Sequence, residues 1–187
     1  MKKATGIVRR IDDLGRIVLP KELRRTLRIR ENDPLEIYID DGGEIILKKY
    51  SPIINLNASY INEYAKTLQQ MFGDIDVLIC DDEKICAAAG SGQKHYMGKK
   101  IHDDMFKILT QKQCMSLLLQ EKERINITFD DKEISTQAIS IIKVNNDDIA
   151  GAIISLDKKS CRDPEKLDYL SKTTAAMAHL IGTSIFF

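Results

Sequence analysis

The sequence predicts an α+β chain in two parts, a small amino-terminal unit of short strands and a larger domain that mixes helices with strands. The chain has 187 residues, enough for one domain or two small ones. Short apolar runs bounded by turn residues fill positions 1–50, whereas apolar residues at helical spacing dominate later segments. Ser51 and Pro52 interrupt the pattern, so we expect domains at 1–52 and 53–187.

The first unit begins with two short apolar runs. Residues 4–11 and 17–19 are expected to form strands on either side of a turn that contains Gly15. Pro20 suits the first position of a helix, and Leu23 and Leu27 lie four residues apart on one helical face. A single turn or two of helix is therefore expected after the second strand.

A β-hairpin completes this unit. Residues 35–39 alternate apolar with polar side chains, and Asp41, Gly42 and Gly43 form a tight turn into residues 44–50. Four short strands and one short helix bury too little apolar surface to be stable alone. We therefore expect two copies of this unit to interleave as a dimer.

The second part has the composition and order of a mixed sensor-type domain. We expect helices over about 55–72, around 105–109 and over 163–187, strands at 76–80, 85–89, 135–144 and 149–156, and a loop over 90–100. No element is assigned to residues 111–132.

Charge is distributed unevenly although the chain has 28 basic and 28 acidic residues. Residues 1–30 carry ten basic and three acidic side chains, a net charge of +7, whereas residues 51–187 have a net charge of −3. The total of zero excludes a polycation that coats nucleic acid indiscriminately. The local excess favours attraction of the first unit to a polyanion.

Composition excludes several classes of protein. Hydrophobic residues make up 43% of the chain, no apolar run approaches the ~18 residues of a membrane span, and the amino terminus has no signal-peptide core. We expect a cytoplasmic protein with no membrane partner. Four cysteines without a CxxC pair are expected to be free thiols.

Residues 4–50 closely resemble the DNA-binding domain of the AbrB transition-state regulators, through the segments TGIVRR, DLGRIVLP, KELRRTL and ILKKY. The resemblance implies a swapped-hairpin β-barrel built by a homodimer, with double-stranded DNA as its partner. The family's DNA-contacting arginines fall on Arg9, Arg16, Arg24 and Arg25; Arg10 occupies a Lys or Arg position, and Lys2 and Lys3 add charge.

The rest of the chain resembles the regulatory domain of the stage V sporulation protein T family, which has a GAF fold, through NEYAKTL, VLICD, GSGQKHYMGKKI and IAGAIISLDK. The resemblance implies a regulator that activates and represses late sporulation genes in the forespore, associated with the nucleoid. A GAF pocket for an unknown small-molecule signal would involve Val77, Ile79, Gly90, Ser91 and Ile153. An equally good interpretation is that side chains fill the space of this pocket and that the domain only oligomerises.

Other motifs are expected to be structural. Asp12 and Asp13 fit a turn beside Gly15 better than a catalytic pair. The Gly90–Gly92 segment lacks the P-loop pattern, and Cys80, Cys86 and His95 match no zinc spacing. We therefore expect no catalytic residue, no metal and no cofactor.

The first and last helices of the second domain flank it in sequence. We expect them to form an oligomer interface that assembles dimers into a homotetramer. Two other functions remain open at this point. One is an antitoxin-type DNA-binding autoregulator, although antitoxins built on this barrel usually continue into a disordered tail. The other is a GAF-fold thiol enzyme.

Overall fold

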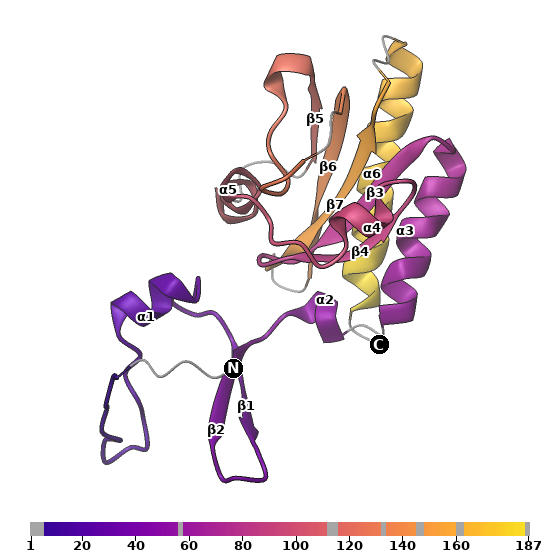
Figure 1. Cartoon of the computed structure of the whole chain (residues 1–187). Helices are drawn as coiled ribbons and strands as arrows, with labels where there is room; N and C mark the ends of the chain where they lie inside the picture. Colours follow the sequence, from indigo (N-terminus) through magenta and orange to yellow (C-terminus); the bar gives the residue numbers. More distant parts are fainter. Residues whose placement is uncertain are drawn as a thin grey trace. The chain divides into compact units, whose positions relative to one another are not determined.

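The computed structural model describes residues 6–55, 58–111, 116–131, 134–144, 148–159 and 163–185 (Figure 1). The chain divides into two compact units, Met1–Tyr50 (unit 1) and Ser51–Phe187 (unit 2). The expected boundary, after residue 52, lies close to this division.

Unit 1 contains helix α1 (Lys21–Thr26) and a hairpin of β1 (Leu35–Ile39) and β2 (Ile45–Lys49). The strands pair antiparallel from Leu35 with Lys49 to Ile39 with Ile45. The Asp40 carboxylate accepts hydrogen bonds from the backbone N–H groups of Gly42 (3.1 Å) and Glu44 (2.9 Å), which closes the turn. The predicted hairpin is confirmed.

The two strands expected at 4–11 and 17–19 are not formed in the single chain. Residues 6–19 have no strand structure, and residues 4 and 5 lie outside the described residues. A strand is stable only when a neighbouring strand takes up its backbone hydrogen bonds. Within the part of unit 1 that the structure describes, β1 and β2 pair only with each other, so residues 6–19 have no strand to join.

Unit 2 is built on an antiparallel sheet that, in the described residues, has five strands in the order β4-β3-β7-β6-β5. The strands are β3 (Ile75–Cys80), β4 (Ile85–Ala89), β5 (Ser116–Gln120), β6 (Thr136–Lys143) and β7 (Ile149–Asp157). The helices are α2 (Pro52–Asn55), α3 (Ala58–Phe72), α4 (Gln93–Tyr96), α5 (Asp103–Gln111) and α6 (Pro164–Ser184), with a 3-10 turn η1 at Glu121–Glu123.

Both faces of this sheet are covered. Val77, Ile79 and Ile153 face a core that also contains apolar residues of α3 and α6. Leu78 and Ile154 point to the opposite face, where they share a core with α4 and α5. Successive strand residues alternate between the two faces, and because both faces are covered, β3, β6 and β7 are buried along nearly their whole length.

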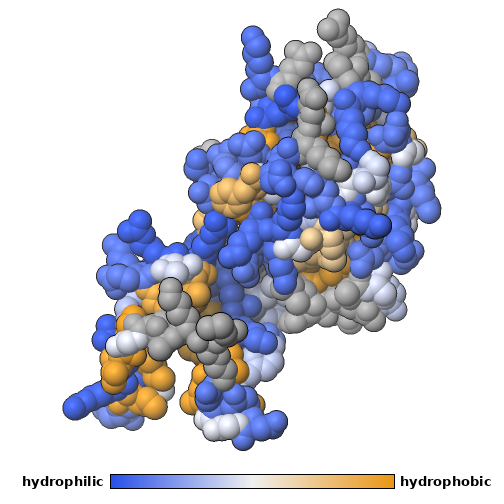
Figure 2. Space-filling model, in the orientation of Figure 1, coloured by the Kyte–Doolittle hydropathy of each residue, from blue (hydrophilic) through white to orange (hydrophobic). Residues whose placement is uncertain are grey.

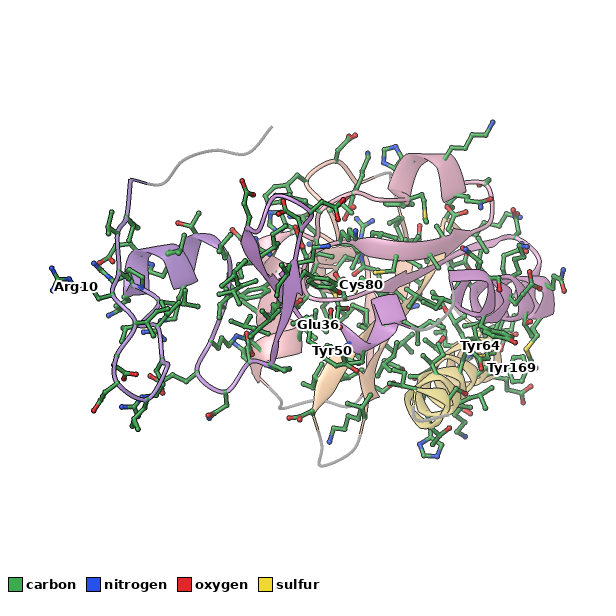
Figure 3. The ribbon with its side chains drawn as sticks, turned by 90° about the horizontal axis from the view of Figure 1, so that it is seen from below. Arg10, Glu36, Tyr50, Tyr64, Cys80 and Tyr169 are labelled. Atoms are coloured by element: carbon green, nitrogen blue, oxygen red, sulfur yellow. The ribbon has the colours of Figure 1, made fainter. Side chains whose placement is uncertain are left out.

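Helices α3 and α6 run antiparallel beside each other (Figures 1 and 3). Near one end the Tyr64 hydroxyl donates to Ser184 Oγ (3.0 Å), and near the other the rings of Phe72 and Tyr169 are 5.2 Å apart. The cap of α6 is as expected, because the Asp163 carboxylate accepts from the Glu165 N–H and Pro164 takes the first position.

Three elements differ from the sequence expectations. Pro52 starts helix α2, α4 lies inside the expected loop, and β5 lies in the unassigned segment. β5 is a sheet edge whose side chains are only half-buried or exposed, so its pattern is weak. α4 is held by local bonds, from the His95 and Tyr96 N–H groups to the Gly92 carbonyl, which leave no apolar periodicity. None of the described helices is long and apolar enough to span a bilayer.

Candidate nucleic-acid interface

The arginines expected to contact DNA come from the segment before α1 and from α1 itself. Arg9, Arg10, Arg16 and Arg25 are exposed and Arg24 is half-buried. Arg10 points away from the ribbon of unit 1 (Figure 3). Lys2 and Lys3, expected to add to the same charge, lie outside the described residues.

A tight turn positions Arg16. The Asp12 carboxylate accepts from the backbone N–H of Leu14 (3.1 Å) and of Arg16 (2.7 Å), and from Arg16 Nε (2.8 Å). Hydrogen bonds from the Arg16 backbone and side chain lower the pKa of Asp12. Gly15 allows the turn with a φ of +76°. Asp12 therefore shapes the turn and restrains one guanidinium, which is the structural role expected for it.

Helix α1 carries Arg24 and Arg25 in its last turn and Glu22 in its first. Each charge lies at the end of the helix that its sign favours. Arg28 follows with a φ of +53°, and the Ile29 N–H bonds the Arg24 carbonyl (2.8 Å), so the chain reverses there. This local geometry presents the two arginines at one end of a short helix.

Lys49 of strand β2 contacts the loop after α1 and stabilises it. Lys49 Nζ donates to the Arg28 carbonyl (3.2 Å) and pairs with the Asp33 carboxylate (3.0 Å). Asp33 also accepts from the Arg30 N–H (2.9 Å). The arginine-bearing segment and the hairpin are thus connected by charge-assisted hydrogen bonds. The sequence pattern did not reveal this role of Lys49, because its partners lie 16 and 21 positions away.

Unit 1 has no core of its own. None of its described side chains, in residues 6–50, is buried. Figure 2 shows orange, hydrophobic surface on unit 1. Twelve large apolar or aromatic residues of this unit are exposed, and we call them the apolar surface of unit 1: Ile7, Val8, Ile11, Leu14, Ile17, Val18, Leu27, Ile37, Tyr38, Ile39, Ile45 and Leu47. Patches of this kind are rare on stable monomers and mark a binding surface.

The residues expected around a GAF pocket fall into two groups. Val77, Ile79 and Ile153 are fully buried in the core under α3 and α6. Gly90 and Ser91 follow β4 and lie beside Asp76, whose side chain alternates to the other face of the sheet. The structure therefore does not bring all five residues to one face of the sheet.

A buried carboxylate missed by the sequence analysis organises that second group. Asp76 is 1% exposed and accepts from the Gly92 N–H (2.7 Å), and it pairs with Lys158 Nζ at 3.0 Å. Lys158 also donates to Ser91 Oγ. A Cβ at Gly90 would lie 2.5 Å from the Asp76 carboxylate, so glycine is required for this close approach. The available signal was an aspartate within an otherwise apolar strand.

Cys80 and Cys86, the two cysteines within the described residues, lack the character of nucleophiles, whereas Cys114 and Cys161 lie outside those residues. Burial raises the pKa of the Cys80 thiol well above its usual value, and burial together with Asp81 raises the pKa of Cys86 to about 12. Among the described residues, no three His, Cys, Asp or Glu side chains are grouped to hold a metal. His95 instead hydrogen-bonds the Asp130 carbonyl through Nε2 at 2.6 Å.

Two family models match different parts of the chain. Residues 57–183 match the family model "Stage V sporulation protein T C-terminal, transcription factor", and residues 8–55 match "Antidote-toxin recognition MazE, bacterial antitoxin". Stage V sporulation protein T of Bacillus subtilis is 45% identical over 153 residues, which cover 81% of this chain and 84% of the relative.

The transition state regulatory protein AbrB of the same organism is 68% identical over 50 residues, 27% of this chain and 51% of AbrB. For unit 2, the A. aeolicus nlh2 GAF domain aligns with a TM-score of 0.52 at 18% identity, covering 67% of this chain and 82% of that structure. The fold of unit 2 is therefore GAF-like, as expected. The length and identity of these matches show that the chain belongs to the stage V sporulation protein T family of transcription factors.

Proposed function

We propose that this transcription factor binds specific DNA sequences through unit 1 and activates and represses late sporulation genes, at the nucleoid in the cytoplasm of the forespore. The observation that carries the proposal is that unit 1 contains these arginines but has no buried core of its own. A second copy of unit 1 would complete such a core. The similarity to AbrB over these residues supports the same assignment.

A homodimer through unit 1 accounts for two observations together. Residues 6–19 have strand-like sequence without a strand partner, and the apolar surface of unit 1 is uncovered. Each large apolar side chain that becomes fully buried contributes about 1.5–3 kcal/mol, so twelve per chain provide a large driving force for pairing. A swapped-hairpin barrel would satisfy the backbone and the side chains at once.

Dimerisation also doubles the basic surface. Arg9, Arg10, Arg16, Arg24 and Arg25 would occur twice, related by the dimer axis. Guanidinium groups can bind phosphate or the O6 and N7 edge of guanine with two hydrogen bonds. About six to eight phosphate contacts would give a log–log salt slope on the order of −5 to −7.

Alanine substitution tests the arginines. We expect Arg24→Ala or Arg25→Ala to abolish binding to a DNA site selected by the wild-type chain, because each change removes a forked cation from both protomers. The measurement is a gel shift, with analytical ultracentrifugation to show that the variants still dimerise. Lys94→Ala removes an exposed cation from unit 2 and serves as the control. An unchanged shift in both arginine variants would refute their assignment.

We further propose that unit 2 assembles dimers into a homotetramer through α3 and α6. These two neighbouring helices expose Tyr60, Met71, Tyr169 and Leu180. Leu180→Glu is expected to reduce the tetramer to a dimer in light scattering. Met97→Glu is the matched control, since Met97 is 47% exposed and Leu180 48%, but Met97 follows α4. Equal masses for both variants would contradict the interface.

Unit 2 would regulate unit 1 by setting how the DNA-binding units are arranged, and an unknown small-molecule signal would act by binding one arrangement better than another. The proposed pocket residues remain Val77, Ile79, Gly90, Ser91 and Ile153. The complete burial of the three apolar members favours the alternative in which side chains fill the space. Native mass spectrometry of the full chain tests this, because a retained small molecule would support a pocket.

The match of residues 8–55 to an antitoxin model keeps an antitoxin-type autoregulator as a second candidate. The packed unit 2 stands where such antitoxins have a toxin-binding tail. Inhibition of growth by a neighbouring gene, relieved by this chain, would favour that candidate. The raised pKa values of Cys80 and Cys86 count against a thiol enzyme.

A further inference from the structure

Strand β5 forms one edge of the sheet in unit 2 (Figure 1). It pairs along its whole length with β6, and no other strand of the described residues pairs with its outer side. The opposite edge differs, because the Ile85 N–H of β4 donates to the Lys99 carbonyl (2.9 Å) and the Ile85 carbonyl accepts from the Gly98 N–H (3.0 Å). Since an edge strand presents alternate backbone N–H and C=O groups outward, β5 can accept a further strand.

The composition of β5 does not protect this edge. Natural edge strands commonly carry a lysine, a proline or a bulge, each of which discourages pairing with another chain. β5 consists of Ser116, three leucines and Gln120, and its register with β6 shows no shift. The leucines are half-buried, and the strand contains no charged side chain. An uncharged edge has nothing that would select an acidic or a basic peptide, so the occupant that it fits is an uncharged strand.

The order of residues in β5 is self-complementary. Two copies of β5 that pair antiparallel about a two-fold axis at Leu118 place this residue opposite its own copy. Leu117 then lies opposite Leu119. Ser116 lies opposite Gln120. Every pair matches an apolar side chain with an apolar one, or a polar side chain with a polar one. A shift of the register by two residues would instead place Leu118 opposite Ser116 or Gln120, which matches an apolar with a polar side chain.

Both faces of such a joined sheet would also match. Leu118 packs against the core under α3 and α6, whereas Leu117 and Leu119 pack against the core that contains α4 and α5. Pairing would bring the two half-buried Leu118 side chains together on the first face, and Leu117 and Leu119 together on the second. Each contact would extend a core that one copy already contains, and it would remove further apolar surface from water.

We propose that β5 is a self-association surface, through which two copies of unit 2 join edge to edge into one continuous antiparallel sheet. The inference goes beyond the proposed function, because neither DNA binding nor a contact between α3 and α6 of different copies needs this edge. It rests on the proposed homodimer in one respect: chains held in one assembly have a high effective concentration, which allows a short strand pair to form. A closed tetramer contains more than one kind of two-fold contact, so the β5 contact can coexist with a helix contact.

Cysteine cross-linking in the full chain tests the pairing and its register. Leu118→Cys is introduced into a background with Cys114→Ala and Cys161→Ala, which leaves only the thiols of Cys80 and Cys86, whose pKa values are raised. A disulfide requires two Cα atoms within about 7 Å, and residues directly opposite in an antiparallel pair satisfy this limit. The sample is oxidised by dissolved oxygen with copper phenanthroline, and the disulfide-linked dimer is measured on a non-reducing gel.

Leu119→Cys in the same background is the matched control, because residue 119 would lie opposite residue 117 and more than about 7 Å from its own copy. We expect Leu118→Cys to form the dimer at least about tenfold faster than Leu119→Cys. Co-expression of tagged Leu117→Cys with untagged Leu119→Cys should yield the mixed dimer, which its mass identifies. Circular dichroism shows whether each variant is folded, and if Leu118→Cys folds poorly, the mixed pair still tests the register.

Equal rates for Leu118→Cys and Leu119→Cys would overturn the pairing of β5. The absence of a disulfide dimer in every variant would also overturn it, since something other than a second copy would then cover this edge. Analytical ultracentrifugation of the wild type tests the homodimer separately. A monomeric wild type overturns the proposed homodimer together with this inference, whereas an oligomeric wild type without the disulfide in the variants overturns only the pairing of β5.

Discussion

The carboxylate of Asp76 is expected to be a main determinant of stability in unit 2. Asp76→Ala removes the acceptor of the Gly92 N–H, which is buried, and the partner of Lys158, whose side chain is 37% exposed. The exposed part of Lys158 allows water to solvate its charge, so the loss falls mainly on the Gly92 N–H. A buried donor left without an acceptor costs about 1–3 kcal/mol.

Removal of the side chain also leaves a small cavity, so the total loss in free energy of unfolding should be about 2–4 kcal/mol. Asp76→Asn keeps an acceptor for Gly92 and loses only the charge, and it should cost about half as much or less. The assay is urea denaturation of the full chain, followed by circular dichroism, with the midpoint compared between variants.

The neighbouring ion pair supplies the control. Asp74 pairs with Lys159 at 2.5 Å, close to the Asp76 pair along the chain, but both of its side chains are more than three-quarters exposed. Exposed pairs contribute little, so Asp74→Ala should leave the midpoint unchanged. Equal midpoints for Asp76→Ala and the wild type would refute the reasoning, and so would an equal loss in the Asp74 and Asp76 variants.

Two further predictions concern the thiols and helix α6. Because the pKa values of Cys80 and Cys86 are raised, both thiols should stay protonated at pH 8 and resist iodoacetamide in the folded chain. Both should react after the chain is unfolded. Peptide mass spectrometry measures the labelling, and rapid labelling of the folded chain would contradict the prediction. Gly182→Ala should destabilise unit 2 by about 1–3 kcal/mol, since its Cβ would collide with the Lys143 carbonyl oxygen; urea denaturation measures the loss, and an unchanged midpoint would contradict it.

Features set by neighbouring residues could be predicted from the sequence. The β1–β2 hairpin follows from strand alternation and from Asp40, Gly42 and Gly43, whose turn bonds span only four residues. The capping of α6 by Asp163 is equally local. The DNA-contacting arginines depend on the resemblance of their segment to a known family, and they remain predictions here.

Features set by long-range pairing could not be predicted. Residues 6–19 have the composition of strands, but strand formation requires a partner, and the single chain supplies none in its described part. The edge strand β5 has a weak pattern because one of its sides is not covered by another strand. The proposed pocket residues follow from the resemblance to the GAF fold, whereas alternation along β3 places Val77 and Ile79 in the core under α3 and α6.

By itself, the sequence determined the two-part organisation, the charge of the first thirty residues and the elements whose signals lie within one turn or one hairpin. Only the tertiary structure decided which polar groups become buried. Asp76 and Asp81 are ordinary acidic residues in the sequence, and their roles arise because Gly92, Lys158 and Ser51 meet them from distant positions. The physical reason is that a carboxylate is stable inside a protein only where the fold delivers donors to it, and those donors come from segments that the local sequence does not specify.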